Sequence, residues 1–411
     1  MTAFGIDRLI SDPGRFLDGR RVALLANQAS LTVDGTPTLE ALRAAPGVEL
    51  VALLTPEHGW SGTEDDATPI PDRRDPRTGL PLVSLYGPRR RPAPEALRAF
   101  DAVVVDLQDV GVRCYTYATT VALLCEVAAE TGTRVVVCDR PNPLGPPVDG
   151  PALDPALRSF LGYLDVPFQH GLTIGALLQQ ATRDLGVDLC VVPASASDAA
   201  RVGDAARVGD AARVSGAARV HFVPPSPGLP NLDAVRLYPG LVLLEGANLS
   251  EGRGTTLPFQ LLGAPWIDGY ALAASLNRLD LPGLHFRPLT FRPRSDTHAG
   301  EVCHGVQLHV VEAGALRPLE AVVRVLAHLR ATHDAFAWVD AGAMPWAQHP
   351  DAGAPWFEPV RGPLIDALTG DDAVRRVIDG ELAWDDAVAG WPGGGVHGPA
   401  PAPGPVGGRG R

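Results

Sequence analysis

Short apolar runs alternate with amphipathic segments through the first half of the chain. Runs of four to six apolar residues between turn formers are typical of strands buried on both faces. They predict strands over Arg21–Ala26, Glu49–Thr55, Ala102–Asp106, Arg134–Cys138 and Asp188–Val192. The intervening segments predict helices over Thr38–Ala45, Pro94–Phe100, Tyr115–Glu130 and Ile174–Leu185. This alternation indicates an α/β fold with a doubly wound, mainly parallel sheet.

The pattern changes beyond Pro224. There it predicts a strand over Leu241–Leu244 and then a second unit from Leu261, with a helix over Tyr270–Asn277, a strand over Val306–Val311 and helices over Leu319–Thr332, Leu364–Leu368 and Asp371–Ile378. We therefore divide the chain into a domain over 1–260, a smaller domain over 261–391 and a Gly/Pro-rich tail over 392–411, which we expect to be disordered.

A six-residue repeat, Ala-Ala-Arg-Val-Gly-Asp and its variants, occupies residues 198–220. A step of six residues turns a helix by about 240°, so the valines of the repeat would not share one helical face. Most units also contain a glycine. We interpret the repeat as an exposed and disordered insertion that is dispensable for function.

Charge and composition narrow the possible functions. The 411 residues include 35 basic ones, all arginine, and 47 acidic ones, for a net charge of −12. Without lysine, the chemistry of P-loop NTPases, protein kinases and Schiff-base enzymes is excluded. An acidic chain without a basic stripe also argues against nucleic acid as a partner.

The same sequence predicts a cytoplasmic protein. No stretch approaches the roughly 18 apolar residues that cross a bilayer, so we expect no membrane partner. Residues 1–15 show no export signal. The five cysteines are widely spaced and mostly lie in apolar segments, as reduced core residues do.

Three of the predicted strands end in clusters of polar residues: Pro56–Gly59, Asp106–Asp109 and Asp139–Pro143. In an open α/β sheet, ligands bind in the crevice beyond the carboxyl ends of the strands. The three clusters therefore predict a single site, either catalytic or sugar-binding.

Glu57 and His58 directly follow the second of the predicted strands. A carboxyl group at the mouth of a strand, partly desolvated by Trp60, is expected to have a raised pKa and to serve as a general acid. The alternative is a glutamate that caps a loop or a helix N-terminus.

The segment after the third strand brings several polar side chains together. Strand alternation places Asp106 and Gln108 on one side, while Arg113 and Tyr115 start the next helix. These residue types are typical of a surface that binds a polyhydroxylated or carboxylated ligand. The alternative is a buried salt-bridge network that locks the turn.

Other candidates have a structural alternative too. Asp139 and Arg140 either contact a ligand or pair with each other for structural reasons. His170 precedes a helix and either points into the cleft or packs beneath it. Glu251 and Arg253 lie among glycines, which would let the backbone approach a ligand closely.

The sequence predicts neither a cofactor nor a metal. No Gly-x-Gly-x-x-Gly follows the first strand, so a nicotinamide cofactor is not supported. The histidines and cysteines near residue 300 lack a recognised metal-ligand spacing. Metal-dependent hydrolysis is the weakest hypothesis, and loss of activity with a chelator would revive it.

Several motifs occur in a characteristic order. They are Pro56–Gly59, Ser84–Gly87, Asp106–Tyr117, Asp139–Gly145, His170–Gly175, Pro225–Pro227, Ser250–Thr255 followed by Pro258-Phe259, Gly263–Trp266 and Gly305–Val310. With these motifs the chain, from about Gly5 to Trp391, resembles the NamZ-type exo-β-N-acetylmuramidases, a bacterial family long catalogued as a domain of unknown function.

The resemblance implies a Rossmann-like domain, a smaller α+β domain that closes the cleft, and a site between them. It implies release of N-acetylmuramic acid from the non-reducing end of peptidoglycan fragments, in cell-wall turnover and recycling. The substrate would be a small saccharide that contains N-acetylmuramic acid. Glu57 matches the catalytic glutamate proposed for the family, and Glu251 matches its second cleft acid. The other motif positions hold Asp106, Gln108, Arg113, Tyr115, Asp139, Arg140, Asn142, His170 and Arg253.

These matches lead to a mechanistic hypothesis. Glu57 is the general acid, and Glu251 or Asp106 is the second carboxylate, acting as base or nucleophile. If the acetamido group of the substrate participates instead, His58 is its polarising partner. Either Arg113 or Arg253 binds the lactyl carboxylate of muramic acid.

The chain departs from the family pattern at two positions. Ala176 replaces the usual acid after the His-Gly motif, and Gly228 replaces the usual Asn after Pro-Ser-Pro, although Asn231 lies close by. The competing hypothesis is therefore a non-catalytic sugar-binding or sensor protein that kept the fold.

Overall fold

The computed structural model describes residues 4–17, 21–87, 89–194, 222–344 and 361–392. The repeat predicted over 198–220 lies outside these residues, as does the predicted tail apart from its first residue.

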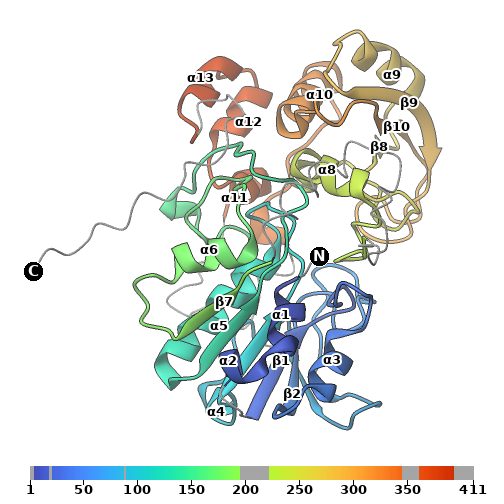
Figure 1. Ribbon diagram of the computed structural model, residues 1–411. Helices are drawn as coiled ribbons and strands as arrows, with labels where there is room; N and C mark the ends of the chain where they lie inside the picture. Colours follow the sequence, from blue (N-terminus) through green and yellow to red (C-terminus); the bar gives the residue numbers. More distant parts are fainter. Residues whose placement is uncertain (1–3, 18–20, 88, 195–221, 345–360, 393–411) are drawn as a thin grey trace, which may run out of the picture.

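A seven-stranded sheet forms the first part of the molecule (Figure 1). Its strands are β1 (Arg21–Ala26), β2 (Glu49–Thr55), β3 (Arg73–Arg74), β4 (Pro81–Ser84), β5 (Ala102–Asp106), β6 (Arg134–Cys138) and β7 (Leu189–Val192). Their order is β3-β4-β2-β1-β5-β6-β7, and every pair except β3 with β4 is parallel. The predicted α/β class is confirmed, whereas β3 and β4 were not predicted.

Helices cover both faces of this sheet. They are α1 (Gly5–Ser11), α2 (Pro13–Leu17), α3 (Thr38–Ala44), α4 (Pro94–Leu97), α5 (Thr116–Thr131) and α6 (Ile174–Ala181), with a 3₁₀ turn over Pro155–Leu157. In β1, Val22 and Leu24 face one core with α1, α2 and α3, while Ala23 and Leu25 face the other with α4, α5 and α6. Since both faces are buried, the strands are apolar throughout instead of alternating.

A smaller antiparallel sheet lies in the second part of the molecule (Figure 1). Its strands β8 (Leu261–Ala264), β9 (Leu284–Phe291) and β10 (Cys303–Val310) have the order β8-β10-β9. The helices here are α8 (Leu232–Leu241), α9 (Gly269–Asn277), α10 (Pro318–Thr332), α11 (Leu364–Thr369), α12 (Ala373–Ile378) and α13 (Trp384–Ala389), with 3₁₀ turns over Val242–Gly246 and Ala341–Ala343. The sequence pattern missed β8, β9, α8 and α13.

The strand predicted over Leu241–Leu244 is wrong. Leu241 ends α8, and the chain continues as the 3₁₀ turn Val242–Gly246. All four residues are buried, and an apolar run without periodicity fits a buried helix as well as a buried strand. Helix α8 packs against α10 of the second part. The domain boundary at residue 260 stays a prediction.

The order of the sheet fixes where a site can form. Strand β1 lies between β2 and β5, so the chain crosses to opposite sides of β1 in succession. A crevice opens at such a switch point, beyond the carboxyl ends of the strands. The loop that follows β2 and the N-terminus of α5 both lie at this edge.

No helix in the described part of the chain is long and apolar enough to span a membrane. The five cysteines are all free, and all but Cys190 are buried.

Candidate active site

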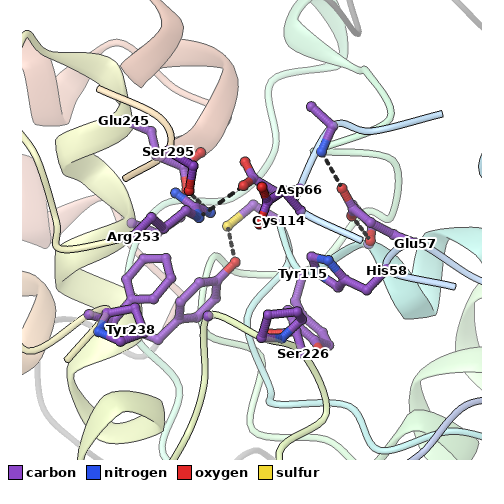
Figure 2. Close-up of a pocket in the computed structure, with 18 of the residues that line it drawn as sticks. Glu57, His58, Asp66, Cys114, Tyr115, Ser226, Tyr238, Glu245, Arg253 and Ser295 are labelled. Atoms are coloured by element: carbon purple, nitrogen blue, oxygen red, sulfur yellow. Dashed lines mark hydrogen bonds and ion pairs between the residues drawn. The ribbon is translucent and has the colours of Figure 1, made fainter. Parts of the chain in front are cut away.

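A cavity of about 270 Å³ lies at the switch point, between the two parts of the chain (Figure 2). The first part contributes Glu57, His58, Asp65, Asp66, Ala67, Tyr86, Cys114, Tyr115, Thr116 and Leu161. The remaining lining residues are Ser226, Pro227, Gly228, Tyr238, Val242, Glu245, Arg253, Gly254, Thr255, Pro258, Phe259, Ser295, Met344 and Leu368. Carboxyl groups from both parts therefore line one cavity.

Glu57 is held by hydrogen-bond donors on both of its oxygens. Oε1 accepts a bond of 3.1 Å from the backbone N–H of Ala67, and Oε2 accepts one of 2.6 Å from the Thr116 hydroxyl. Burial raises the pKa of Glu57, but His58, these two bonds and the Tyr86 hydroxyl outweigh it, so that the pKa is lowered. The expected raised pKa is therefore wrong, because donors surround the group and favour its ionised form.

His58 has a constrained backbone beside Glu57. Its φ of 67° lies in the left-handed region, which costs a non-glycine residue free energy. The ring Nδ1 lies 3.0 Å from the carbonyl oxygen of Glu64, and the side chain lines the cavity. The loop thus folds back on itself and presents Glu57 and His58 to the same space.

Arg253 lies across the cavity from Glu57 (Figure 2) and forms ion pairs with four carboxyl groups. Its Nη2 is 2.6 Å from Glu245, its Nη1 is 2.9 Å from Glu251 and 3.5 Å from Asp296, and its Nε is 3.3 Å from Asp66. Asp66 comes from the loop after β2, so the guanidinium ties the two parts of the molecule together (Figure 2).

Of the two glutamates in this cluster, Glu245 lines the cavity, and so does the cluster's Asp66. The side chain of Glu251 is only 1% exposed and does not line the cavity, whereas that of Glu245 is 19% exposed and does. The resemblance indicated Glu251 as the second cleft acid, but in this structure Glu251 is buried against Arg253 and does not line the cavity.

Two glycines shape the loop that carries Arg253. Gly252 and Gly254 have φ angles of 92° and 70°, which glycine alone adopts without strain. A Cβ on Gly254 would lie 2.4 Å from the backbone nitrogen of Ser295. These glycines let the loop pack closely against a neighbouring backbone segment, and Gly254 also lines the cavity.

Asp106 and Arg140 form a buried salt bridge outside the cavity. Arg140 Nε lies 2.6 Å from Asp106 Oδ1, and the two side chains are 4% and 0% exposed. Arg140 also stacks over the Phe4 ring at 4.6 Å. Neither residue lines the cavity, which favours the structural alternative, a buried salt bridge, over a catalytic Asp106 and a substrate-binding Arg140.

Four further candidates pin loops beneath the site and do not line the cavity: Gln108, Asp139, Asn142 and His170. Gln108 donates to two backbone carbonyls, Asn142 donates to two more, and Asp139 accepts from Thr173 and the Gly175 backbone. His170 packs in the interior, with Nε2 3.6 Å from Asp109. Their polar atoms serve backbone groups that burial would otherwise leave unpaired.

Arg113 also lies outside the cavity, as a buried cross-link. Its guanidinium donates to the carbonyl oxygens of Pro151, Val166 and Thr369, of which Thr369 ends α11. Burial lowers its pKa to about 10. These contacts favour a structural role for Arg113 and leave Arg253 as the stronger candidate for the lactyl carboxylate.

We expect Arg113→Lys to destabilise the protein by about 1–3 kcal/mol, because a lysine cannot hold the three carbonyls that the guanidinium holds. The ratio of kcat/KM between muramoyl and glucosaminyl substrates should not change. Thermal unfolding measures the change in stability, and kcat/KM for the muramoyl and the glucosaminyl substrate measures the substrate preference. A changed substrate preference at unchanged stability would contradict this assignment.

The two departures from the family pattern have different settings. Ala176 lies in α6, where its backbone N–H binds the N-cap Thr173, and it is not part of the cavity wall. Gly228 does line the cavity, and a Cβ there would approach the Phe259 ring at 3.1 Å. Asn231 is the N-cap of α8.

Sequence reasoning missed three acids of the Arg253 cluster, Asp66, Glu245 and Asp296, and the Thr116 and Tyr86 partners of Glu57. Glu245 follows the apolar run that was misread as a strand, and a helical reading of residues 232–246 would have put it in the same turn as Val242. No local signal marks Asp66 or Asp296, because the contacts that define them come from distant segments.

The fold and the cavity define an α/β protein with a carboxylate-lined site between two parts of one chain. The chain belongs to the exo-β-N-acetylmuramidase NamZ family: the sequence model of the family's N-terminal domain matches residues 22–233, and that of its C-terminal domain matches residues 236–394. The earlier resemblance is confirmed.

Individual relatives agree. Over 333 residues the chain is 38% identical to the peptidoglycan β-N-acetylmuramidase NamZ of Bacillus subtilis (strain 168), covering 81% of this chain and 77% of that protein. Two crystal structures of DUF1343 family proteins from Bacteroides fragilis NCTC 9343 superpose with TM-scores of 0.75 and 0.66, at 29% and 28% identity. Each superposition covers 95% of this chain and 94% of the other.

Proposed function

We propose that this protein is a glycosidase that releases N-acetylmuramic acid from the non-reducing end of peptidoglycan fragments. The observation that carries the proposal is a buried glutamate, Glu57, that lines the cavity and accepts hydrogen bonds on both oxygens, in a chain that matches the NamZ family through both of its domains. The 38% identity with a named peptidoglycan β-N-acetylmuramidase supports the same substrate class.

In this proposal Glu57 acts as a carboxylate, not as the proton donor. Both of its oxygens accept hydrogen bonds, from Ala67 and Thr116. The transition state of glycoside hydrolysis resembles an oxocarbenium ion, and a preorganised negative charge stabilises it. The side chain of His58 lies beside the carboxylate, where it can orient the acetamido group of the sugar.

The lactyl carboxylate needs a cationic partner, and Arg253 is the arginine that lines the cavity among the described residues. Its contacts with Asp66 and Asp296 are its longest, at 3.3 and 3.5 Å, and these two acids are 34% exposed. We propose that the lactyl group takes the place of one of them. Arg253 then distinguishes muramic acid from glucosamine by its bidentate geometry.

Incubation with para-nitrophenyl β-N-acetylmuraminide and with the matching glucosaminide tests this function. We expect nitrophenol release from the muramoyl compound and at least about tenfold less from the glucosaminyl one, which corresponds to about 1.4 kcal/mol of discrimination. Binding of muramic acid without release would favour the sensor hypothesis, and equal release from both compounds would contradict the proposed specificity.

We also propose that the protein acts in the cytoplasm on small, peptidoglycan-derived saccharides. The support is the state of the five cysteines, which are all free, as is usual for a protein of a reducing compartment. Cell fractionation with an antibody to the native protein tests the location.

A further inference from the structure

We propose that Glu245 is the general acid of the reaction, donating the proton that the leaving-group oxygen requires. This inference rests on the proposed glycosidase function. It assigns the proton donor to an acid that neither the sequence motifs nor the family resemblance singled out. Four observations lead to it: the position of Glu245, its hydrogen bonds, the charge around it and its contrast with Glu57.

Glu245 borders the same cavity as Glu57 but comes from the other part of the chain. It lies in the 3₁₀ turn that continues α8, so a regular element fixes its position. Figure 2 shows Arg253 and Glu245 on one side of the cavity and Glu57 on the other. A sugar in the cavity would lie between the two carboxyl groups.

One oxygen of Glu245 is free to carry a proton. Oε1 accepts the 2.6 Å bond from Arg253 Nη2. Oε2 has no hydrogen-bond partner among the residues that the structure describes. A neutral carboxyl group can accept through one oxygen and donate through the other, so the bond to Arg253 is compatible with protonation.

The charge around Glu245 favours the protonated form. Four carboxyl groups surround the single guanidinium of Arg253. If all of them were ionised, the cluster would hold three uncompensated negative charges in a buried position, which is costly. The groups that interact electrostatically with Glu245 are Arg253, Asp66, Glu251, Asp296, Cys114 and Tyr238.

Burial, opposed by Arg253 but reinforced by three acids of the cluster, raises the pKa of Glu245 to about 8. The pKa of Glu57 is lowered. Two carboxyl groups whose environments push their pKa values apart are the usual arrangement of an acid and its partner carboxylate in one site. At neutral pH, Glu245 holds a proton while Glu57 is ionised.

As the bond between the anomeric carbon and the leaving oxygen breaks, its electron pair stays on the oxygen, which takes the proton from Glu245 Oε2 and leaves as an alcohol. Arg253 stabilises the glutamate anion that remains. Water then adds its hydroxide to the anomeric carbon, and the proton that it releases goes to the Glu245 anion, which restores the acid.

Two substrates of different leaving-group ability test this role in Glu245→Gln. The disaccharide of N-acetylmuramic acid and N-acetylglucosamine needs protonation, whereas a 2,4-dinitrophenyl muraminide does not. We expect kcat to fall about 10²- to 10⁴-fold on the disaccharide and by less than about tenfold on the dinitrophenyl compound. The alkaline limb of the kcat/KM profile, near pH 8 in the wild type, should be absent.

Glu251→Gln is the matched control, because it removes the same charge from the same cluster at a position outside the cavity wall. A positioning effect through Arg253 should lower the two rates equally. Equal losses in Glu245→Gln, or an alkaline limb that persists, would overturn the proposal. Wild-type protein inactive on both substrates would instead overturn the proposed function.

Glu245→Asp covers the case in which the glutamine variant does not fold. Aspartate keeps a carboxyl group with a proton to donate but moves it away from the substrate. We expect a reduced rate on the disaccharide and an alkaline limb that is retained, although displaced. Full wild-type activity on the disaccharide without that limb would exclude Glu245 as the donor.

Discussion

Replacing Glu57 by glutamine is expected to lower kcat for release of N-acetylmuramic acid by about 10³-fold, on activated and natural substrates alike. The carboxylate acts on the charge of the sugar ring, which develops whatever the leaving group is. This uniform loss distinguishes Glu57 from Glu245, whose effect depends on the leaving group. The variant should fold, because glutamine can keep bonds to Ala67 and Thr116.

The acid limb of the wild-type pH profile of activity is a second test of the role of the Glu57 carboxylate. Activity requires ionised Glu57, and its pKa lies below the ordinary value of 4.5. Activity should therefore persist down to about pH 4.5 and fall below it. Glu64→Gln is the control, since it removes a charge from the same loop outside the cavity; a comparable loss there would mean that the loop's charge matters, not the Glu57 carboxylate.

Most of the N-terminal sheet was predictable, for a physical reason. Buried parallel strands need apolar residues on both faces, so runs such as Ala102–Asp106 identify themselves. The bounds of β1, β2, β5 and β6 match the prediction. The edge strand β3 and its neighbour β4 were missed because they are two and four residues long and partly exposed.

The site was predictable only in part, because a charged residue in a loop at the edge of the sheet can either line the cavity or form an ion pair inside the core. Glu57 and Arg253 face the cavity, while Asp106 and Arg140 neutralise each other within the core. Sequence spacing cannot separate these cases, since the deciding partner comes from elsewhere in the chain. Arg113 shows this best: two of its carbonyl partners lie at least 53 positions away.

Arg253 pairs with four carboxyl groups, and its removal should have the largest effect on stability. We expect Arg253→Met to destabilise the protein by about 3–5 kcal/mol at pH 8, because buried carboxylates lose their counter-charge. Thermal or urea unfolding at pH 5 and pH 8 measures the effect. Arg77→Met, which removes an ion pair whose arginine is 70% exposed, should cost no more than about 1 kcal/mol.

The pH dependence of this loss of stability tests whether Arg253 stabilises the fold as a counter-charge to the buried carboxylates. Arg253 lowers the pKa values of Glu245, Glu251 and Asp296, which burial raises above those of an unfolded chain. A carboxyl group with a raised folded-state pKa contributes stability that is present below its unfolded pKa and is lost as pH rises through the folded one. Without Arg253 these pKa values rise further. The loss in free energy of unfolding caused by Arg253→Met should therefore be large at pH 8 and smaller at pH 5. An equal deficit at both values would mean that the arginine stabilises the fold by packing, not by holding the carboxylates of the site together.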